Sequence, residues 1–248
     1  MTAAPIISCQ CVTYGRVSLL QEALASFLSQ DFEESEMVIF NDFPQQTLVF
    51  DHPRVRIINL AMRGPSMGWA RNACTEQCRG HLIVRWDDDD LQLPHHLSQL
   101  VSNWRDGESW VGIVPHYYAE GWAIKSVAGG RHPNSVAFTK DAWRKIGGFM
   151  EGPLVPNMHE DQVFMGKLYP MPGHEVESHR PSFIYHWGNG AYHVTGSADT
   201  PTSHQRVGQH VESEVRRQVQ PTGIIKLEPQ FRKKPVDMVT EFCELRTP

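Results

Sequence analysis

Apolar residues in the first hundred positions follow two different patterns. Four short apolar runs are typical of buried strands: residues 5–12, 37–40, 55–60 and 82–86. Three other stretches have helical spacing or helix-starting residues: 16–30, 66–78 and 94–104. Strands that alternate with helices in this order predict an α/β fold, with a mostly parallel central sheet and flanking helices.

The second half of the chain is less regular. Further strands are predicted at residues 110–118, 135–138 and 183–187, and helices at 141–146 and 160–169. Valines recur at every fourth position from Val207 to Val219, which predicts a final helix. We therefore expect one domain over residues 1–203, followed by a C-terminal helix and tail over 204–248 that pack on it.

Length and charge narrow the class of protein. The chain has 248 residues, and no apolar window approaches the roughly eighteen residues that a membrane span needs. The first residues contain neither a basic region nor a long apolar stretch, so we expect no secretory signal. The formal net charge of -5 is opposite to the positive excess that is usual in a general nucleic-acid binder.

The five cysteines, Cys9, Cys11, Cys74, Cys78 and Cys243, leave at least one thiol unpaired within the chain. A zinc site would need the first four to converge, but neither spacing is that of a zinc ribbon or finger. The simpler interpretation makes them small buried residues, one pair on a strand and the other on a helix. A reduced, cytoplasmic protein fits this cysteine usage best.

Polar residues follow several of the predicted strands. Thr13 and Tyr14 come after the first strand, Asp42 follows the second, and the four consecutive aspartates 87–90 follow a later one. The carboxyl ends of parallel strands form the ligand-binding edge of such sheets, so we expect these residues to gather there. Adjacent carboxylates repel one another, and a bound Mg²⁺ or Mn²⁺ would relieve that repulsion and bridge to substrate phosphates. The alternative is a solvated acidic loop.

An ordered series of short motifs extends over residues 5 to about 195. It consists of Thr13-Tyr14-Gly15-Arg16, Asn41-Asp42, Ala70-Arg71-Asn72, Asp87-x-Asp89-Asp90 with Pro94 behind it, Gly147-Gly148-Phe149 and Glu160-Asp161. This series resembles the motifs of family 2 glycosyltransferases. The resemblance implies the Rossmann-like GT-A fold with its D-x-D metal motif. Its nucleotide-sugar half would cover about 1–105, and its acceptor half about 106–203.

The resemblance implies donor-binding roles for the matching residues Thr13, Tyr14, Arg16, Asp42, Arg71, Asp87 and Asp88. In the family pattern, Tyr14 would stack on the nucleotide base and Asp42 would hydrogen-bond the base ring. Arg71 would face the diphosphate or the sugar, and Asp87 or Asp88 would contact the ribose or the sugar. These roles describe a site for a nucleotide-sugar.

The remaining implied roles concern the metal and the acceptor. Asp89 matches the aspartate that binds Mn²⁺ or Mg²⁺, and Asp161 matches the catalytic base. Late histidines often reach the metal in this fold, which makes His193 the preferred second ligand and His186 its alternative. Glu160 and Trp187 are candidate acceptor contacts, although a helix-terminal acid and ordinary core packing would also explain them.

Together these features predict an inverting, metal-dependent glycosyltransferase that moves one sugar from a nucleotide-sugar to a hydroxyl acceptor, a glycan or a small molecule. UDP is expected as the nucleotide from its frequency in the family. The Q-x-x-R-W motif of processive synthases is absent, so transfer of a single sugar is expected.

Three alternatives remain at this point. In the first, the chain binds a nucleotide-sugar without catalysing transfer. In the second, the acceptor is a hydroxymethylated DNA base, and the basic tail residues Arg232-Lys233-Lys234 would contact the DNA. The segment Gly64-Pro65-Ser66-Met67-Gly68 also matches the nucleophile elbow of α/β-hydrolases. An elbow should follow its strand directly, which this segment does not, so a helix cap at Ser66 is the better interpretation.

Overall fold

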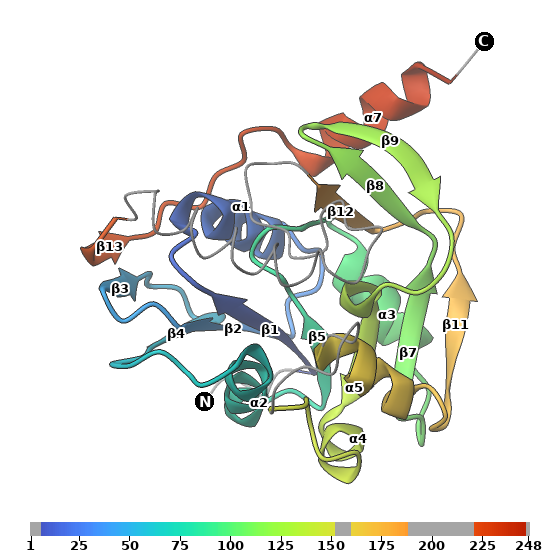
Figure 1. The fold of residues 1–248 in the computed structure, drawn as a ribbon. Coiled ribbons are helices and arrows are strands. Elements are labelled where there is room, and N and C mark those ends of the chain that lie inside the picture. The colour runs from blue at the N-terminus through green and yellow to red at the C-terminus, as the bar shows by residue number, and fades with distance from the viewer. Residues whose placement is uncertain (1–5, 152–159, 188–220, 247–248) are drawn as a thin grey trace, which may run out of the picture.

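The computed structural model describes residues 6–151, 160–187 and 221–246 (Figure 1). A seven-stranded sheet forms its centre, in the order β11 (Gly173–Glu177), β7 (Trp110–Val114), β10 (Val136–Thr139), β5 (Leu82–Arg85), β1 (Ile7–Thr13), β2 (Ser35–Asn41) and β4 (Val55–Asn59). β10 runs antiparallel to both of its neighbours, and the other pairs in this sheet are parallel. The predicted α/β fold with a mostly parallel sheet is confirmed.

Helices cover both faces of this sheet (Figure 1). The core on one face includes residues of α1 (Val17–Leu28) and α3 (His96–Asn103). The core on the other face includes residues of α2 (Met67–Gln77), α4 (Lys140–Lys145) and α5 (Glu160–Leu168). Helices of this length are marginal alone in water, so burial of their apolar sides against the sheet is what stabilises them.

The four N-terminal cysteines divide between these two cores. Cys9 and Cys11 of β1 lie in the core beside α1, whereas Cys74 and Cys78 lie in the core beside α2. All four are buried and free. Since the pairs lie on opposite faces of the sheet, they do not share a zinc ion, and the interpretation as small buried residues is confirmed.

A second sheet has four strands, in the order β6 (Leu91–Gln92), β12 (Phe183–Trp187), β8 (His116–Glu120) and β9 (Ala123–Ala128). The prediction of one strand over 110–118 is wrong. Pro115 separates β7 from β8, and the two strands belong to different sheets. Proline has no backbone N–H to donate, so it interrupts the ladder at this point.

The described part of the tail contributes a strand and a helix. β13 (Gly223–Lys226) pairs in parallel with β3 (Gln46–Val49). α7 (Pro235–Glu244) places Met238 and Phe242 in a third core with Tyr117 of the second sheet. The helix predicted around Val207 to Val219 lies outside the described residues. None of the helices in the described ranges combines the length and apolar character that crossing a membrane requires.

Candidate functional site

The carboxyl ends of β5, β1 and β2 lie side by side at one edge of the central sheet. β1 pairs with β2 so that Thr13 lies opposite Asn41, and on its other side β1 pairs with β5, the strand that runs into the aspartates. The first residues of α5, Glu160 and Asp161, are hydrogen-bonded to residues of α2 and β5 near this edge. The topology therefore gathers most of the predicted site residues, as expected for a parallel sheet.

Asp88 and Asp89 share one arginine. Arg16, which precedes α1, donates to Asp88 through Nε at 3.1 Å and through Nη2, and to Asp89 through Nη1 at 2.8 Å. Thr13 Oγ1 also donates to Asp88 Oδ2, at 2.6 Å. Burial, only partly offset by Arg16, raises the pKa of Asp88 to about 6. We call Arg16, Asp88 and Asp89 the Arg16 cluster.

Asp87 is held by two arginines. Arg71 of α2 donates to its Oδ1 at 3.1 Å, and Arg85 of β5 donates to its Oδ2 at 2.6 Å. Asn134 Nδ2 adds a third hydrogen bond, to Oδ2, at 3.0 Å. Burial alone would raise the pKa of Asp87, but the two guanidinium groups hold it well below its usual range. Asp87 is therefore ionised under all ordinary conditions.

The same two arginines hold the acidic residues of α5. Arg71 Nε donates to Glu160 Oε1 at 3.0 Å, and Arg85 Nη1 donates to Asp161 Oδ2 at 2.9 Å. Burial acts to raise the pKa of Asp161, but Arg85 and Arg71 outweigh it and lower that pKa. We call Arg71, Arg85, Asp87, Glu160 and Asp161 the Arg85 cluster. It connects a predicted donor contact to the predicted base within one network.

Asp90 differs from the other aspartates of the run in its described partners, which are a backbone N–H and an amide instead of arginines. Its carboxylate accepts hydrogen bonds from the backbone N–H of His186 at 2.9 Å and from Asn134 Nδ2 at 2.8 Å. Burial, together with the charges of Asp89 and Asp87, raises the pKa of Asp90 well above its usual range. The alternative of a solvated acidic loop is wrong, since the side chains of the run are largely buried.

The predicted base-binding residues meet the loop between β4 and α2. The Tyr14 ring contacts Phe43 edge-on, with centroids 5.1 Å apart, and the Arg63 guanidinium lies over the Tyr14 ring at 4.4 Å. Asp42 Oδ1 accepts a hydrogen bond from the backbone N–H of Gly64 at 2.6 Å, and burial raises the pKa of Asp42. Arg63 and Gly64 thus border the two side chains that would contact a nucleotide base.

The divalent cation implied by the resemblance has a suitable donor set in this structure. Asp88 and Asp89 present carboxylate oxygens, which Mg²⁺ and Mn²⁺ prefer, and Arg16 pairs with both side chains. Within residues 6–151, 160–187 and 221–246, no group of three or more His, Cys, Asp or Glu side chains forms a complete metal cage. A hard cation held by one or two carboxylates and by substrate phosphates needs no such cage. The residues therefore fit the ion.

Two predicted site residues cannot be placed with their side chains. His193 lies outside the described residues, and so does the side chain of Trp187 at the end of β12. The alternative ligand, His186, is described. Its Nε2 is hydrogen-bonded to the carbonyl oxygen of Gly121, and its ring meets Trp122 edge-on with centroids 4.4 Å apart. This histidine ring is thus engaged within the second sheet.

Ser66 and the basic tail residues have structural partners. Ser66 Oγ accepts a hydrogen bond from the backbone N–H of Trp69 at 3.1 Å, so it is the N-cap of α2, as its sequence position predicts. Arg232 pairs with Glu22, and Lys233 pairs with Glu241 of α7. Two of the three basic tail residues that suggested DNA contact therefore form ion pairs within the chain.

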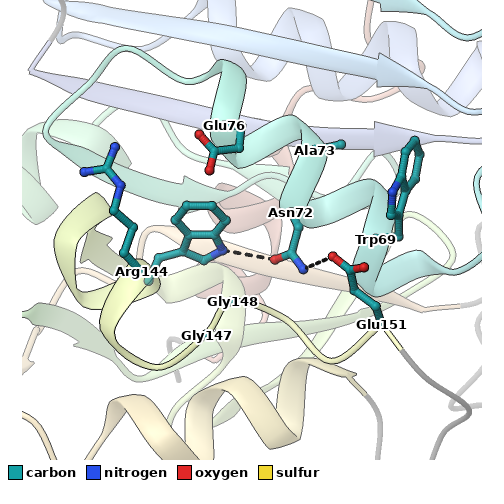
Figure 2. A pocket seen from close by; sticks show the side chains of 9 residues that line it. Trp69, Asn72, Ala73, Glu76, Arg144, Gly147, Gly148 and Glu151 are labelled. Carbon is teal, nitrogen blue, oxygen red and sulfur yellow. Dashed lines mark hydrogen bonds between the residues drawn. The ribbon is translucent and has the colours of Figure 1, made fainter.

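A separate cleft of about 470 Å³ lies between α2 and the α4 region (Figure 2). Its central residue, Asn72, accepts hydrogen bonds at Oδ1 from Phe149 N (2.8 Å) and Trp143 Nε1 (3.0 Å). Its Nδ2 donates to Phe149 O and to Glu151. Gly148 has a φ of +70°, and a Cβ there would lie 2.5 Å from Asn72 Oδ1, so this turn requires glycine. Asn72 therefore secures the Gly-Gly-Phe segment, and its own polar atoms are occupied.

Three residues of the site were missed from the sequence. Arg85 was treated as part of a buried apolar strand, although a charged residue at such a position calls for a buried partner, and this signal was available. Asn134 lies in a short 3-10 helix, η1 (Pro133–Ser135), before β10, and Arg63 lies in a loop. Their contacts depend on tertiary structure, and no pattern in the sequence points to them.

Comparison with known proteins extends this description. The model of a family described as glycosyl transferase family 2 matches residues 8–169, more than half of the chain. A Bacillus subtilis protein named as an uncharacterized glycosyltransferase, YwdF, is 31% identical over 143 residues, which are 54% of this chain and 51% of that protein. The chain thus spans about half the length of this curated relative.

Solved structures share the fold at low sequence identity. S. aureus TarS in complex with UDP-GlcNAc has a TM-score of 0.60 at 17% identity, over 87% of this chain and 68% of that one. The mannosyltransferase PcManGT from Pyrobaculum calidifontis, in complex with GDP-Man and Mn²⁺, has a TM-score of 0.55 at 15% identity, over 89% of this chain and 67% of that one. The GT-A fold is confirmed, and by its family match the chain belongs to glycosyl transferase family 2.

Proposed function

We propose that the chain transfers one sugar from a UDP-linked nucleotide-sugar to a hydroxyl acceptor, with inversion at the anomeric carbon. The observation that carries this proposal is the Arg85 cluster, in which Asp87 of the donor side and Asp161 of α5 share one guanidinium. The neighbours solved with UDP-GlcNAc and with GDP-Man and Mn²⁺ support a nucleotide-sugar as donor.

Each donor-side residue has a task that suits its surroundings. Tyr14 stacks on the base and Asp42 accepts from the base ring, beside the Arg63 loop. Asp87 and Asp88 accept from ribose or sugar hydroxyls. Thr13, whose hydroxyl group is bonded to Asp88, orients that carboxylate. Arg16 and Arg71 supply positive charge near the diphosphate.

Asp89 and His193 are the residues that would hold a Mn²⁺ or Mg²⁺ ion. When bound, such an ion supplies positive charge that stabilises the leaving diphosphate. Asp89, by holding such an ion, would help to orient the diphosphate end of the donor. Arg16 lies next to the Asp89 carboxylate, at 2.8 Å, and keeps it in place.

On the acceptor side, Asp161 takes the proton of the attacking hydroxyl. Its pKa is lowered, so the carboxylate is ionised at neutral pH, the form in which it can accept a proton. One displacement with the base opposite the leaving group inverts the anomeric centre. Glu160, bonded to Arg71, and Trp187 complete the acceptor side. The free cysteines fit a reducing compartment such as the cytoplasm.

The deciding experiment measures thermal unfolding with UDP-GlcNAc, UDP-glucose or GDP-mannose, each with and without Mn²⁺. A bound donor raises the midpoint, and at equal concentration the tighter donor raises it more, so one donor should stabilise the chain in a Mn²⁺-dependent way. Release of nucleoside diphosphate from that donor then separates an enzyme from a non-catalytic binder. Stabilisation by GDP-mannose alone would reject UDP, and no stabilisation by any donor would reject the proposal.

A further inference from the structure

Arg85 is an unexpected residue for its position in the sheet. It ends β5, whose other residues, 82–84, are buried and apolar, and only 4% of its side chain is exposed. A guanidinium in such surroundings is costly unless carboxylates pair with it. The chain supplies two carboxylates, Asp87 at 2.6 Å and Asp161 at 2.9 Å, on different Nη atoms.

The two arginines of the Arg85 cluster divide the acidic residues of α5 between them. Arg71 reaches Glu160, and Arg85 reaches Asp161. The other oxygen of Asp161, Oδ1, accepts the backbone N–H of Gln162 at 2.7 Å. Both oxygens of this carboxylate are therefore held, and its orientation depends on the planar, two-armed guanidinium of Arg85.

We propose that Arg85 is a positioning residue for sugar transfer, because its guanidinium holds the Asp161 carboxylate at a fixed place relative to Asp87. The base on α5 and the donor contact after β5 then keep one geometry throughout the reaction. Arg85 acts through Asp161, and the inference rests on the proposed function, in which Asp161 takes the acceptor's proton. Small displacements of a reacting group cost rate steeply, which is why such a clamp matters.

Arg85 also affects the pH at which Asp161 can act. Among the described residues, the charged and titratable groups that influence Asp161 or lie beside it are Arg85, Arg71, Asp87, Glu160, His132 and Tyr169. Burial lowers the pKa of His132 to about 3 and raises that of Tyr169 to about 12, so neither changes charge near neutral pH. Burial and the charge of Asp87 raise the pKa of Asp161, and Arg85 opposes both. Without Arg85, the pKa of Asp161 therefore rises. Since Asp161 must be deprotonated to act as the base, the acid limb of the pH–rate profile moves to higher pH.

The test compares Arg85→Gln, Arg85→Lys, Asp161→Asn and the double variant Arg85→Gln/Asp161→Asn in the full chain. The measurement is single-turnover release of nucleoside diphosphate from the donor selected above, with water as the accepting hydroxyl, between about pH 5 and pH 9. We expect Arg85→Gln to be about 10- to 100-fold slower, with its acid limb at higher pH and UDP affinity nearly unchanged. Arg85→Lys keeps the positive charge but not the two-armed guanidinium, so its rate loss should be smaller than that of Arg85→Gln. Added to Asp161→Asn, Arg85→Gln should cost nothing further.

Arg79→Gln is the matched control. Arg79 also pairs with a buried carboxylate, Glu36, at 2.8 Å, but belongs to neither cluster, so its loss should leave the pH profile unchanged. UDP-induced thermal stabilisation verifies that each variant is folded. Should Arg85→Gln not fold, Arg85→Lys and the double variant Arg85→Lys/Asp161→Asn take its place. The inference is then supported if Arg85→Lys is slower than the parent and the double variant is no slower than Asp161→Asn.

Two outcomes overturn the role of Arg85 while leaving the proposed function intact. One is a folded Arg85 variant with the parent's rate and pH profile beside an inactive Asp161→Asn. The other is a further, additive loss in the double variant. Turnover retained in Asp161→Asn is a different result, because it removes the base from Asp161 and overturns that part of the proposed function itself.

Discussion

The Arg16 cluster and the Arg85 cluster adjoin each other at the same edge of the sheet, but they balance their charge differently. In the Arg16 cluster, Asp88 and Asp89 share one guanidinium, and burial raises the pKa of Asp88 to about 6. In the Arg85 cluster, two guanidinium groups hold three carboxylates, and the pKa values of Asp87 and Asp161 are lowered. Neighbouring acidic residues thus differ in character because of their partners.

This difference suggests a division of work. In the Arg16 cluster, burial raises the pKa of Asp88, and a cation beside Asp88 and Asp89 would favour their charged forms. In the Arg85 cluster, the guanidinium groups keep Asp87 and Asp161 ionised and hold their orientation. Experiments that disturb one cluster at a time can therefore break or sharpen the comparison.

The largest effect is expected from Asp161→Asn, in the Arg85 cluster. The amide keeps the shape of the carboxylate but takes no proton, so turnover should fall by about 10²- to 10⁴-fold. UDP and Mn²⁺ affinity should stay close to the parent's, because Asp161 itself has no proposed contact with the donor or the cation. Single-turnover transfer and calorimetry measure the two quantities.

Glu160→Gln is the control for this variant, since Glu160 contacts Arg71 and not Arg85. It should retain most of the turnover. An inactive Glu160→Gln beside an active Asp161→Asn would exchange the two roles. Full activity in both variants would show that the base does not come from the start of α5.

The second effect concerns the cation in the Arg16 cluster. Asp89→Asn should remove the part of UDP binding that depends on Mn²⁺ and leave the fold intact, because the cluster loses one repulsive charge. Calorimetry of UDP binding with and without Mn²⁺ gives the difference directly. Asp87→Asn, in the Arg85 cluster, is the control, and its UDP binding should still be strengthened by Mn²⁺. If Mn²⁺ strengthened UDP binding by Asp89→Asn as much as by the parent, the metal assignment would be refuted.

A smaller effect is expected from pH alone. The pKa of Asp88 is about 6, so this carboxylate takes up a proton as the pH falls from 7 to 5, whereas Asp87 and Asp161 stay ionised. Protonation of Asp88 removes a negative charge next to Asp89, the proposed metal ligand, so Mn²⁺-dependent UDP affinity should weaken over that interval. The contribution of Asp88 to folding has the opposite sign: it is most favourable below about pH 4 and is lost as the pH rises through 6.

Asp88→Asn should flatten this pH dependence, as measured by calorimetry of UDP with Mn²⁺ at several pH values. The same variant should gain stability relative to the parent at pH 7, where the parent carries the unfavourable charge. An equally steep pH dependence in the variant would mean that another group titrates.

The sequence predicted the parallel half of the molecule and the edge where the site lies. The runs around β1, β2, β4 and β5 are apolar and short, and the spacing of α1 and α2 is helical, so hydrophobic periodicity identifies them. The rule for parallel sheets then places Thr13, Asp42 and Asp87 at one edge without further information.

The rest of the fold carried weaker signals. β13 is short and mostly exposed, so it lacks the apolar pattern by which strands are recognised. α7 does have apolar residues four apart, Met238 and Phe242, and a proline at its start, which was a usable signal. The pairing of Arg85 with Asp161, 76 positions away, depends on how α5 docks against β5 and cannot be obtained from spacing.

The smallest effect is expected at Ser66, the cap of the helix that carries Arg71. Ser66→Ala removes the hydrogen bond to the Trp69 N–H and should lower the free energy of unfolding by about 1 kcal/mol, within the 0.5–2 kcal/mol range of such caps. Turnover should not change, because Arg71 lies beyond the first turn of α2 and is held by Asp87 and Glu160. Thr139→Ala is the control, since Thr139 caps α4 with the same geometry, at 3.1 Å from Ala142 N, and should lose similar stability. Thermal unfolding and single-turnover transfer are measured on both. A folded Ser66→Ala with no turnover, beside an active Thr139→Ala, would contradict the cap interpretation and make Ser66 a participant in the chemistry.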